Sequence, residues 1–118
     1  MRPLTIVSLR AAAAITATDN GPAVDVSAFT GNGYLVLNSS ATGAAGQTSA
    51  VKLQHSVDGA TNWTDTGVAF DNVTNAAASH QVQLVSFDQF NKFVRVVNTL
   101  AGTTPTVTAS VEAIGIKA

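Results

Sequence analysis

Cysteine is absent from the 118-residue sequence, and charged side chains are scarce. Without cysteine the chain has no disulfide framework, no thiolate nucleophile and no thiolate metal site. Charged residues make up 11% of the sequence, against about 25% in typical globular domains. A surface with so few charges and a net charge of −1 is poorly protected against association. The composition therefore favours a subunit packed in an assembly over a merely neutral, freely diffusing domain.

The distribution of charged and apolar residues argues against two classes of partner. Neutralising nucleic-acid phosphates needs clustered Lys and Arg, whereas the basic residues here are scattered. They are Arg2, Arg10, Lys52, Lys92, Arg95 and Lys117. A membrane-spanning helix needs about 18 or more consecutive apolar residues, and no segment reaches that length. Arg10 also interrupts the apolar stretch near the N-terminus, so a signal peptide is not indicated. We expect neither a nucleic-acid nor a membrane partner.

The short apolar runs predict an all-β fold. Val, Ile and Thr recur in runs separated by clusters of Gly, Asn and Asp, which is typical of short strands joined by turns. We expect about seven to nine strands, at residues 4–9 (continuing through 11–18), 23–26, 34–38, 51–57, 79–85, 92–99 and 106–117, with a return strand at Trp63. The spacing of Phe87, Phe90 and Phe93 predicts one tight helical turn. A chain of 118 residues can form one modest core. We therefore expect a single domain over residues 1–118, an antiparallel β-sandwich of which the jelly roll is one form.

Two strands have unusual patterns. The segment Tyr34–Asn38 is apolar at successive positions, which predicts a strand covered on both faces. In the last strand, Val107, Ala109, Val111 and Ala113 share one face, whereas Ile114 and Ile116 fall on the other. A bulge near residues 113–115 or a change in exposure would reconcile the two sets.

The sequence contains no convincing catalytic arrangement. A nucleophilic triad needs a base and an orienting carboxylate, and the only candidate bases are His55 and His80. His55 continues the apolar strand face of Val51 and Leu53, so we expect it to be partly buried and satisfied. His80 begins a strand and is expected to be exposed. No motif of a hydrolase, a metalloprotease or a phosphate-binding loop is present. We expect no enzymatic activity and no cofactor.

Acidic and aromatic residues offer two weaker candidate sites. Asp58, Asp65 and Asp71 could together hold a calcium ion, but they lack the spacing of a calcium loop, so turn capping is preferred and no metal is expected. Trp63, beside polar Asn62, could be a platform on which a sugar stacks. A tryptophan packed on its own hairpin is the favoured alternative, because one Trp and one Tyr are few for a glycan platform.

The segment Val51–Asp65 resembles small virion proteins of tailed bacteriophages. In that family a strand ending in QHS-x-DG is followed by Trp or Phe and then by a Thr/Ala-rich stretch. The second half is similar as well, with the strand Lys92–Val97, the turn Gly102–Pro105 and a final strand to Lys117. The resemblance covers residues 51–70 and 80–117. A related hairpin occurs in discoidin-like and other carbohydrate-binding sandwiches, because Asp-Gly forms a good turn that Trp covers. The absence of cysteine and the short chain favour the phage family.

This resemblance implies a head decoration or cement protein on the capsid exterior of a virion. Such a protein binds between subunits of the major capsid protein, often as a trimer. Residues 1–10 suit either an arm that adds a strand to a partner's sheet or an edge strand of the chain's own sandwich. As an arm they would bind the partner through Leu4, Ile6, Val7 and Leu9. The alternative function is a carbohydrate-binding module that adheres to surface glycans through Trp63.

Overall fold

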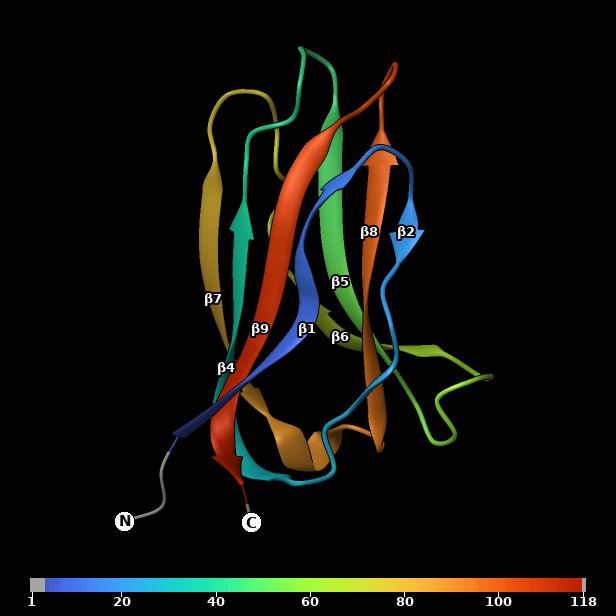
Figure 1. Ribbon diagram of the computed structural model, residues 1–118, viewed down its shortest axis with the longest axis vertical. Helices are drawn as coiled ribbons and strands as arrows, with labels where there is room; N and C mark the ends of the chain where they lie inside the picture. Colours follow the sequence, from blue (N-terminus) through green and yellow to red (C-terminus); the bar gives the residue numbers. More distant parts are fainter. Residues whose placement is uncertain (1–3, 118) are drawn as a thin grey trace.

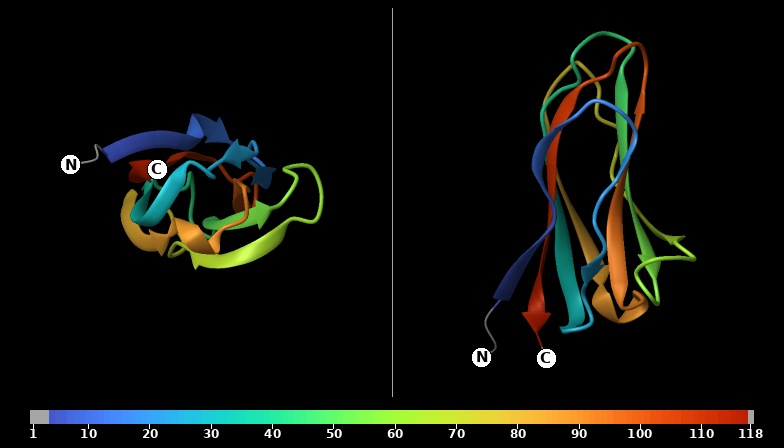
Figure 2. Two further views of the ribbon diagram at one scale, coloured as in Figure 1. Left: turned by 90° about the horizontal axis from the view of Figure 1, so that it is seen from below. Right: turned by 45° about the vertical axis from the view of Figure 1, so that its right-hand side comes forward.

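The computed structural model describes residues 4–117, which form two antiparallel sheets packed face to face (Figures 1 and 2). Sheet A contains, in spatial order, β1 (Leu4–Ile15), β9 (Val107–Lys117), β4 (Phe29–Ser39) and β7 (Ser79–Ser86). Sheet B contains β2 (Asp19–Asn20), β8 (Phe93–Ala101), β5 (Thr48–Ser56) and β6 (Thr64–Ala69), and β3 (Val24–Asp25) also pairs with β8. The predicted helical turn is a short 3-10 helix, η1 (Phe87–Gln89), between β7 and β8. The expected antiparallel β-sandwich is confirmed.

The pairing order is that of a jelly roll. When β2 and β3 are counted as one interrupted strand, the pairs β1–β9, β2/β3–β8, β4–β7 and β5–β6 nest inside one another like a folded hairpin. Rolling this hairpin up brings β9 beside β4 and β8 beside β5, which completes the two sheets. Nested pairing of this kind produces the two Greek keys of a jelly roll.

The core lies between the sheets and consists of aliphatic side chains and three phenylalanines. Its residues are Leu9, Ile15, Val26, Phe29, Leu35, Leu37, Val51, Leu53, Phe70, Val73, Val85, Phe87, Val94, Val96, Val107, Ala109, Val111 and Ala113. The ring of Phe29 stacks on that of Phe87, with centroids 4.6 Å apart, where η1 closes one end of the sandwich. The predicted turn therefore places an aromatic side chain in the core.

Polar side chains connect the two sheets along both open edges. On one edge, Gln83 Nε2 of β7 donates a hydrogen bond to the Ala69 carbonyl of β6 at 3.1 Å. Just beyond β6, Gln81 Nε2 donates to the Asp71 carbonyl at 2.9 Å. On the other edge, Arg10 of β1 forms an ion pair with Asp19 of β2, with Nη2 and Oδ2 2.8 Å apart. Gln81 and Gln83 of β7 therefore point toward sheet B. Because successive strand residues point to opposite faces, Val82 and Leu84 point outward.

The residues near the N-terminus form a strand and not a free arm. Residues 4–9 belong to β1, which is an edge strand of sheet A hydrogen-bonded to β9. Of the proposed arm, residues 1–3 lie outside the described part of the chain. The arm interpretation is therefore wrong for residues 4–9 in this structure, because pairing with β9 satisfies one side of their backbone.

The irregular strand predicted at the C-terminus alternates regularly, and the register shifts lie in its two neighbours, β1 and β4. Alternation along β9 continues through buried Gly115, and Ile114 and Ile116 point to the outer face. The register of β4 against β9 shifts between Thr30 and Tyr34, around Gly31, whose φ is +69°. A change in exposure, and not a bulge in β9, thus explains the position of the two isoleucines.

Candidate interaction surface

An apolar surface extends across all four strands of sheet A on the side facing away from the core. One row across the sheet consists of Ile6, Ile114, Tyr34 and Leu84, which are register partners on β1, β9, β4 and β7. Leu4 and Ile116 extend it on one side, and Val36 and Val82 extend it on the other. We call these eight residues the apolar face: Leu4, Ile6, Tyr34, Val36, Val82, Leu84, Ile114 and Ile116.

The apolar face is exposed to a degree that is unusual for large hydrophobic side chains. In the described part of the chain six such residues are exposed, and five of them belong to this face. Their exposed fractions are 68% for Leu4, 66% for Ile6, 49% for Tyr34, 63% for Val82 and 67% for Leu84. Contiguous exposed apolar patches on soluble proteins commonly mark interaction sites. Covering each of these side chains would contribute roughly 1 kcal/mol or more.

Half of the predicted partner-binding residues lie on this face. Leu4 and Ile6 point outward, as a docking surface requires. Val7 is partly buried against the core and Leu9 is 1% exposed within it, so neither side chain belongs to the outer face of sheet A. Assigning these two residues to a partner was wrong, because successive strand residues point to opposite faces of the sheet. The sequence analysis did not identify Tyr34, Val82 or Leu84 as part of such a surface.

Strand β4 has apolar side chains on both of its faces. Its residues Leu35 and Leu37 are fully buried between the sheets, whereas Tyr34 and Val36 point outward. The sequence predicts a strand covered on both faces, and the described chain covers one of them. The outer side of β4 is therefore apolar without an intramolecular cover.

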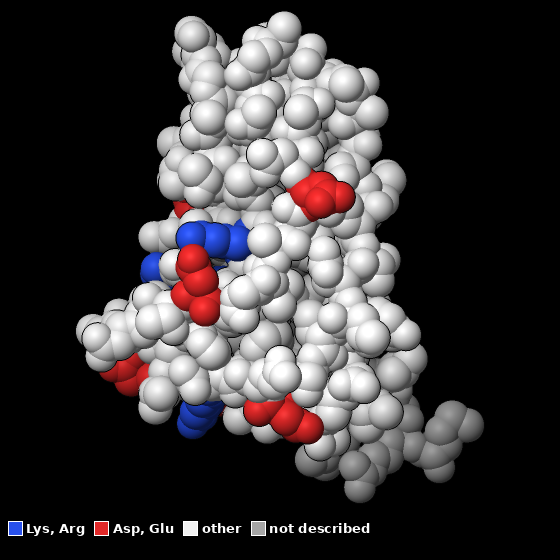
Figure 3. Space-filling view, turned by 180° about the vertical axis from the view of Figure 1, so that it is seen from behind, with Lys and Arg blue, Asp and Glu red and all other residues white. Residues whose placement is uncertain are grey.

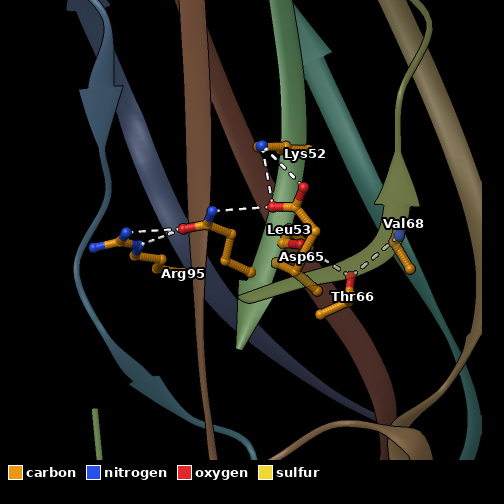
Figure 4. A network of polar contacts seen from close by, with 7 residues as sticks. Lys52, Leu53, Asp65, Thr66, Val68 and Arg95 are labelled. Atoms are coloured by element: carbon orange, nitrogen blue, oxygen red, sulfur yellow. Dashed lines mark hydrogen bonds and ion pairs between the residues drawn. The ribbon is translucent and has the colours of Figure 1, made fainter. Parts of the chain in front are cut away.

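The outer face of sheet B is covered by a polar network (Figure 4). Lys52 Nζ lies 3.0 Å from Asp65 Oδ1, and the same oxygen accepts a hydrogen bond from Gln54 Nε2 at 3.0 Å. Gln54 Oε1 in turn accepts hydrogen bonds from Arg95 Nε and Nη2 at 3.0 and 2.8 Å. The hydrogen bonds from Gln54 and Lys52, together with the charge of Lys52, hold the pKa of Asp65 below its ordinary value.

Trp63, the candidate glycan platform, belongs to this polar region. It lies just before β6 and is half-buried, and the Arg95 guanidinium carbon lies 4.5 Å from the centroid of its ring. This is the geometry of a cation–π contact. The guanidinium thus occupies a ring face on which a sugar would stack. Of the two interpretations made from the sequence, the packed tryptophan agrees better with this structure than the glycan platform does.

The Asp58-Gly59 turn between β5 and β6 is built by one carboxylate. Asp58 accepts hydrogen bonds from the backbone N–H groups of Ala60 and Thr61 and from the hydroxyls of Thr61 and Ser56, at 2.7–3.0 Å. The backbone bonds from Thr61 and Ala60, followed by the two hydroxyl bonds, lower the pKa of Asp58 far below its ordinary value. Turn capping by Asp58 is confirmed, and Asp65 is held separately by Lys52. In residues 4–117 no three His, Asp or Glu side chains are grouped as a metal site would need.

The two histidines have structural partners. His55 Nδ1 accepts a hydrogen bond from the Asn91 backbone N–H at 3.1 Å, and its ring meets Phe90 edge to face. His80 is exposed on β7, with Nδ1 2.8 Å from Asn38 Oδ1. Both placements agree with the sequence interpretation. Nucleophile, base and carboxylate are not assembled around either ring in the contacts of the described residues.

Charged side chains are unevenly distributed over the molecule. In the view of Figure 3 they lie over the middle and lower parts of the molecule, whereas its upper end shows none. That end is formed by loops without charged residues, at positions 40–47, 74–78 and 102–106. Gln47 joins two of these loops, because its Nε2 donates to the Thr103 and Thr104 carbonyls at 2.7 and 3.1 Å. The chain also has, in its described residues, no helix long and apolar enough to cross a membrane.

The topology and surfaces define the class of protein as a jelly-roll β-sandwich with one uncovered apolar side. No protein-family model matches the chain, and no curated protein matches its sequence. Among solved structures, a chain in the structure of infectious bursal disease virus Gx strain is similar, with a TM-score of 0.57 and 10% sequence identity. The match covers 98% of this chain and 32% of that one, so this chain spans about a third of its neighbour's length. At this identity the likeness shows a shared fold.

Proposed function

We propose that this protein is a structural virion protein that decorates and stabilises a bacteriophage capsid by binding between major capsid protein subunits. The observation that carries the proposal is the apolar face of sheet A, which the described chain leaves uncovered. A surface of this kind suits a subunit that is buried in a larger assembly. The fold shared with a chain of a virus particle supports a role in a virion. The hairpin resemblance supports the narrower assignment to phage decoration proteins on the capsid exterior.

The proposed role depends on binding and not on catalysis. His55 is committed to the Asn91 backbone and His80 contacts Asn38. Cementing a shell needs buried area and good packing, and no step of it requires a nucleophile or a base. We therefore propose that the protein is not an enzyme.

The polar network on sheet B argues against glycan adhesion through Trp63. Arg95 lies over the ring and is itself held by two hydrogen bonds to Gln54. A sugar would have to displace this guanidinium. Jelly rolls occur among both lectins and viral capsid domains, so the fold does not choose between the two functions, and the proposal rests on the surfaces.

Quantitative mass spectrometry of purified virions tests the proposal. We expect the protein in a constant ratio to the major capsid protein, and we expect the purified protein to cosediment with shells that lack it. Absence from purified virions, together with no binding to shells, would overturn the proposal. Retention of the wild-type protein on immobilised glycans that Trp63→Ala abolishes without unfolding would favour the carbohydrate-binding module instead.

A further inference from the structure

The outer face of sheet A has two unlike halves along the strand direction. One half is the apolar face, in which Ile6, Tyr34 and Leu84 stand up from the sheet. The other half, nearer the opposite end of the same strands, is a shallow hollow of about 340 Å³. The hollow is lined by alanines, by short hydroxyl side chains, by the amide of Asn38 and by the imidazole of His80. The lining residues are Ala12, Asn38, Ser39, Ser40, Ala78, His80, Thr108, Ala109 and Ser110. A raised apolar half and a recessed half therefore lie side by side on one sheet.

This arrangement is complementary to itself. A two-fold axis that lies between the two faces, parallel to the sheet and perpendicular to its strands, and that passes over Glu112 and Val36, would lay a second sheet on the first with its strands reversed. The raised half of each copy would then rest over the hollow of the other. We propose that the occupant of this surface is a second copy of the chain, and that the free protein is a two-fold dimer. The inference goes beyond the proposed function, because it concerns the protein in the absence of a shell.

The available area is near what a dimer needs. Four strands about 4.8 Å apart, followed for about nine residues at 3.3 Å per residue, span a flat area of roughly 500–600 Å². The relief of the side chains raises the accessible area above this value. A standard interface buries about 800 Å² on each partner. The apolar face and the hollow together approach this area, whereas either half alone is too small.

The distribution of charge provides a signature that separates a second copy from a foreign partner. In the described residues Glu112 is the one Asp, Glu, Lys or Arg among the outward positions of β9, β4 and β7, where it pairs with Ser8 and Val36 in register. The two-fold arrangement brings two Glu112 side chains near the axis, where like charges oppose each other. Removing the charge should therefore strengthen pairing with a second copy, whereas it should weaken docking of a basic partner.

Light scattering and sedimentation of the purified protein, without shells, test the inference. We expect a mass of twice the 12.0 kDa chain at micromolar concentrations. Leu84→Lys in the raised half and Ala12→Phe in the hollow should each weaken dimerisation at least about tenfold, because one buries a charge and the other fills the recess. Glu112→Gln should tighten it severalfold. Val57→Lys is the matched control, since Val57 is 73% exposed but lies in the β5–β6 turn.

A mixture of two variants tests the raised-half-into-hollow geometry. Leu84→Lys keeps an intact hollow, and Ala12→Phe keeps an intact raised half. A heterodimer of the two has one undamaged contact, whereas each homodimer has none, so mixing should produce heterodimers preferentially. Circular dichroism should show that both variants remain folded. A failure to form heterodimers from variants that each lost dimerisation would refute this geometry.

The remaining outcomes also decide the question. A wild-type protein that stays monomeric at about 100 μM, a Leu84→Lys variant with unchanged mass, or weaker pairing of Glu112→Gln would overturn the inference. A mass of three chains would replace the two-fold pair with the trimer that the phage resemblance implies. A monomer that still binds shells would refute the dimer and support the proposed function. A dimer that is absent from virions would support the dimer and refute the proposed function.

Discussion

The two outer faces of the sandwich differ in what covers them. On sheet B, the guanidinium of Arg95 covers one face of Trp63, the one tryptophan of the sequence. Arg95 also donates hydrogen bonds to Gln54, which donates to Asp65, the ion-pair partner of Lys52. On sheet A, the side chains of Ile6 and Leu84 project from the sheet with about two thirds of their surface exposed. The same fold thus has one face suited to solvent and one suited to a neighbour. The difference lies in the outward residues alone, because the inward residues of both sheets form one core.

Giving the apolar face the character of sheet B should have the largest effect. The double substitution of Ile6→Lys and Leu84→Lys places two charges on a surface that we expect to be buried, so association should fall by about 100-fold or more. Because both side chains are exposed in the single chain, the free energy of unfolding of the monomer should change by less than about 1 kcal/mol. Sedimentation and chemical denaturation measure the two quantities. A large loss of folding stability without loss of association would contradict the assignment of this face.

Removing the cover of sheet B should affect stability and not association. Trp63→Ala deletes a half-buried ring and its contact with Arg95, so we expect a loss of about 1–2 kcal/mol in the free energy of unfolding. Arg95→Ala should cost about 1 kcal/mol or less, since the contact is partly exposed to solvent. Denaturant titrations measure both, and the oligomeric mass should not change. A change of mass in either variant would mean that sheet B also contributes to the interface.

Acidification should weaken the turn and network of sheet B before it affects sheet A. The folded-state pKa values of Asp58 and Asp65 are lowered, so their contribution to stability is complete above the unfolded value of about 3.9 and is lost as the pH falls through the folded values. Melting temperatures measured between about pH 5 and pH 2 should therefore decline. Asp58→Asn should reduce this decline, because it removes the carboxylate with the largest shift. An unchanged pH dependence in that variant would contradict the role of the turn.

Salt should have the smallest effect and should act on the two faces differently. The Lys52–Asp65 pair is exposed, so we expect it to contribute little to stability and to weaken as sodium chloride is added. Association through the apolar face should not weaken, and sulfate should strengthen it. Sedimentation across a salt series provides the measurement. Dissociation of the assembly by moderate sodium chloride would indicate an electrostatic interface and count against the apolar face.

The sequence predicts the architecture well because the strands and turns have local signals. Asp58-Gly59 specifies the β5–β6 turn, since Gly59 has a φ of +75° and the Asp58 carboxylate caps it. The spacing of the phenylalanines likewise locates η1. Strand β4 is predicted too short, because glycines interrupt its first half. Gly33 is needed there, since a Cβ at this position would meet the Ile114 carbonyl and the Phe87 ring.

The interaction surface is harder to predict, because alternation does not say which side of a strand faces the core. In β7 the run His-Gln-Val-Gln-Leu-Val suggests that Val82 and Leu84 point inward and the glutamines outward. The structure has the opposite arrangement, because Gln81 and Gln83 hydrogen-bond backbone carbonyls across the edge of the sandwich. The apolar character of both sides of residues 34–38 and the outward parity of Ile114 and Ile116 are the sequence signals of a second cover. Joining them to Leu84 and Ile6 requires the strand order of sheet A, which local patterns do not contain.

Hydroxyl-radical footprinting of the assembled protein tests the burial of the apolar face most directly. Oxidation rates of Tyr34 and Leu84 should be compared with that of Val57 in the wild-type assembly, and the rate of Tyr34 should be compared with that of Val57 in the Ile6→Lys, Leu84→Lys variant. For the variant, Tyr34 and Ile114 provide the comparison on the face. We expect Tyr34 and Leu84 to be strongly protected in the wild-type assembly, Tyr34 to lose its protection in the variant, and Val57 to react equally in both. Oxidation of Tyr34 and Leu84 in the wild-type assembly at the rate of a fully exposed side chain would contradict the account.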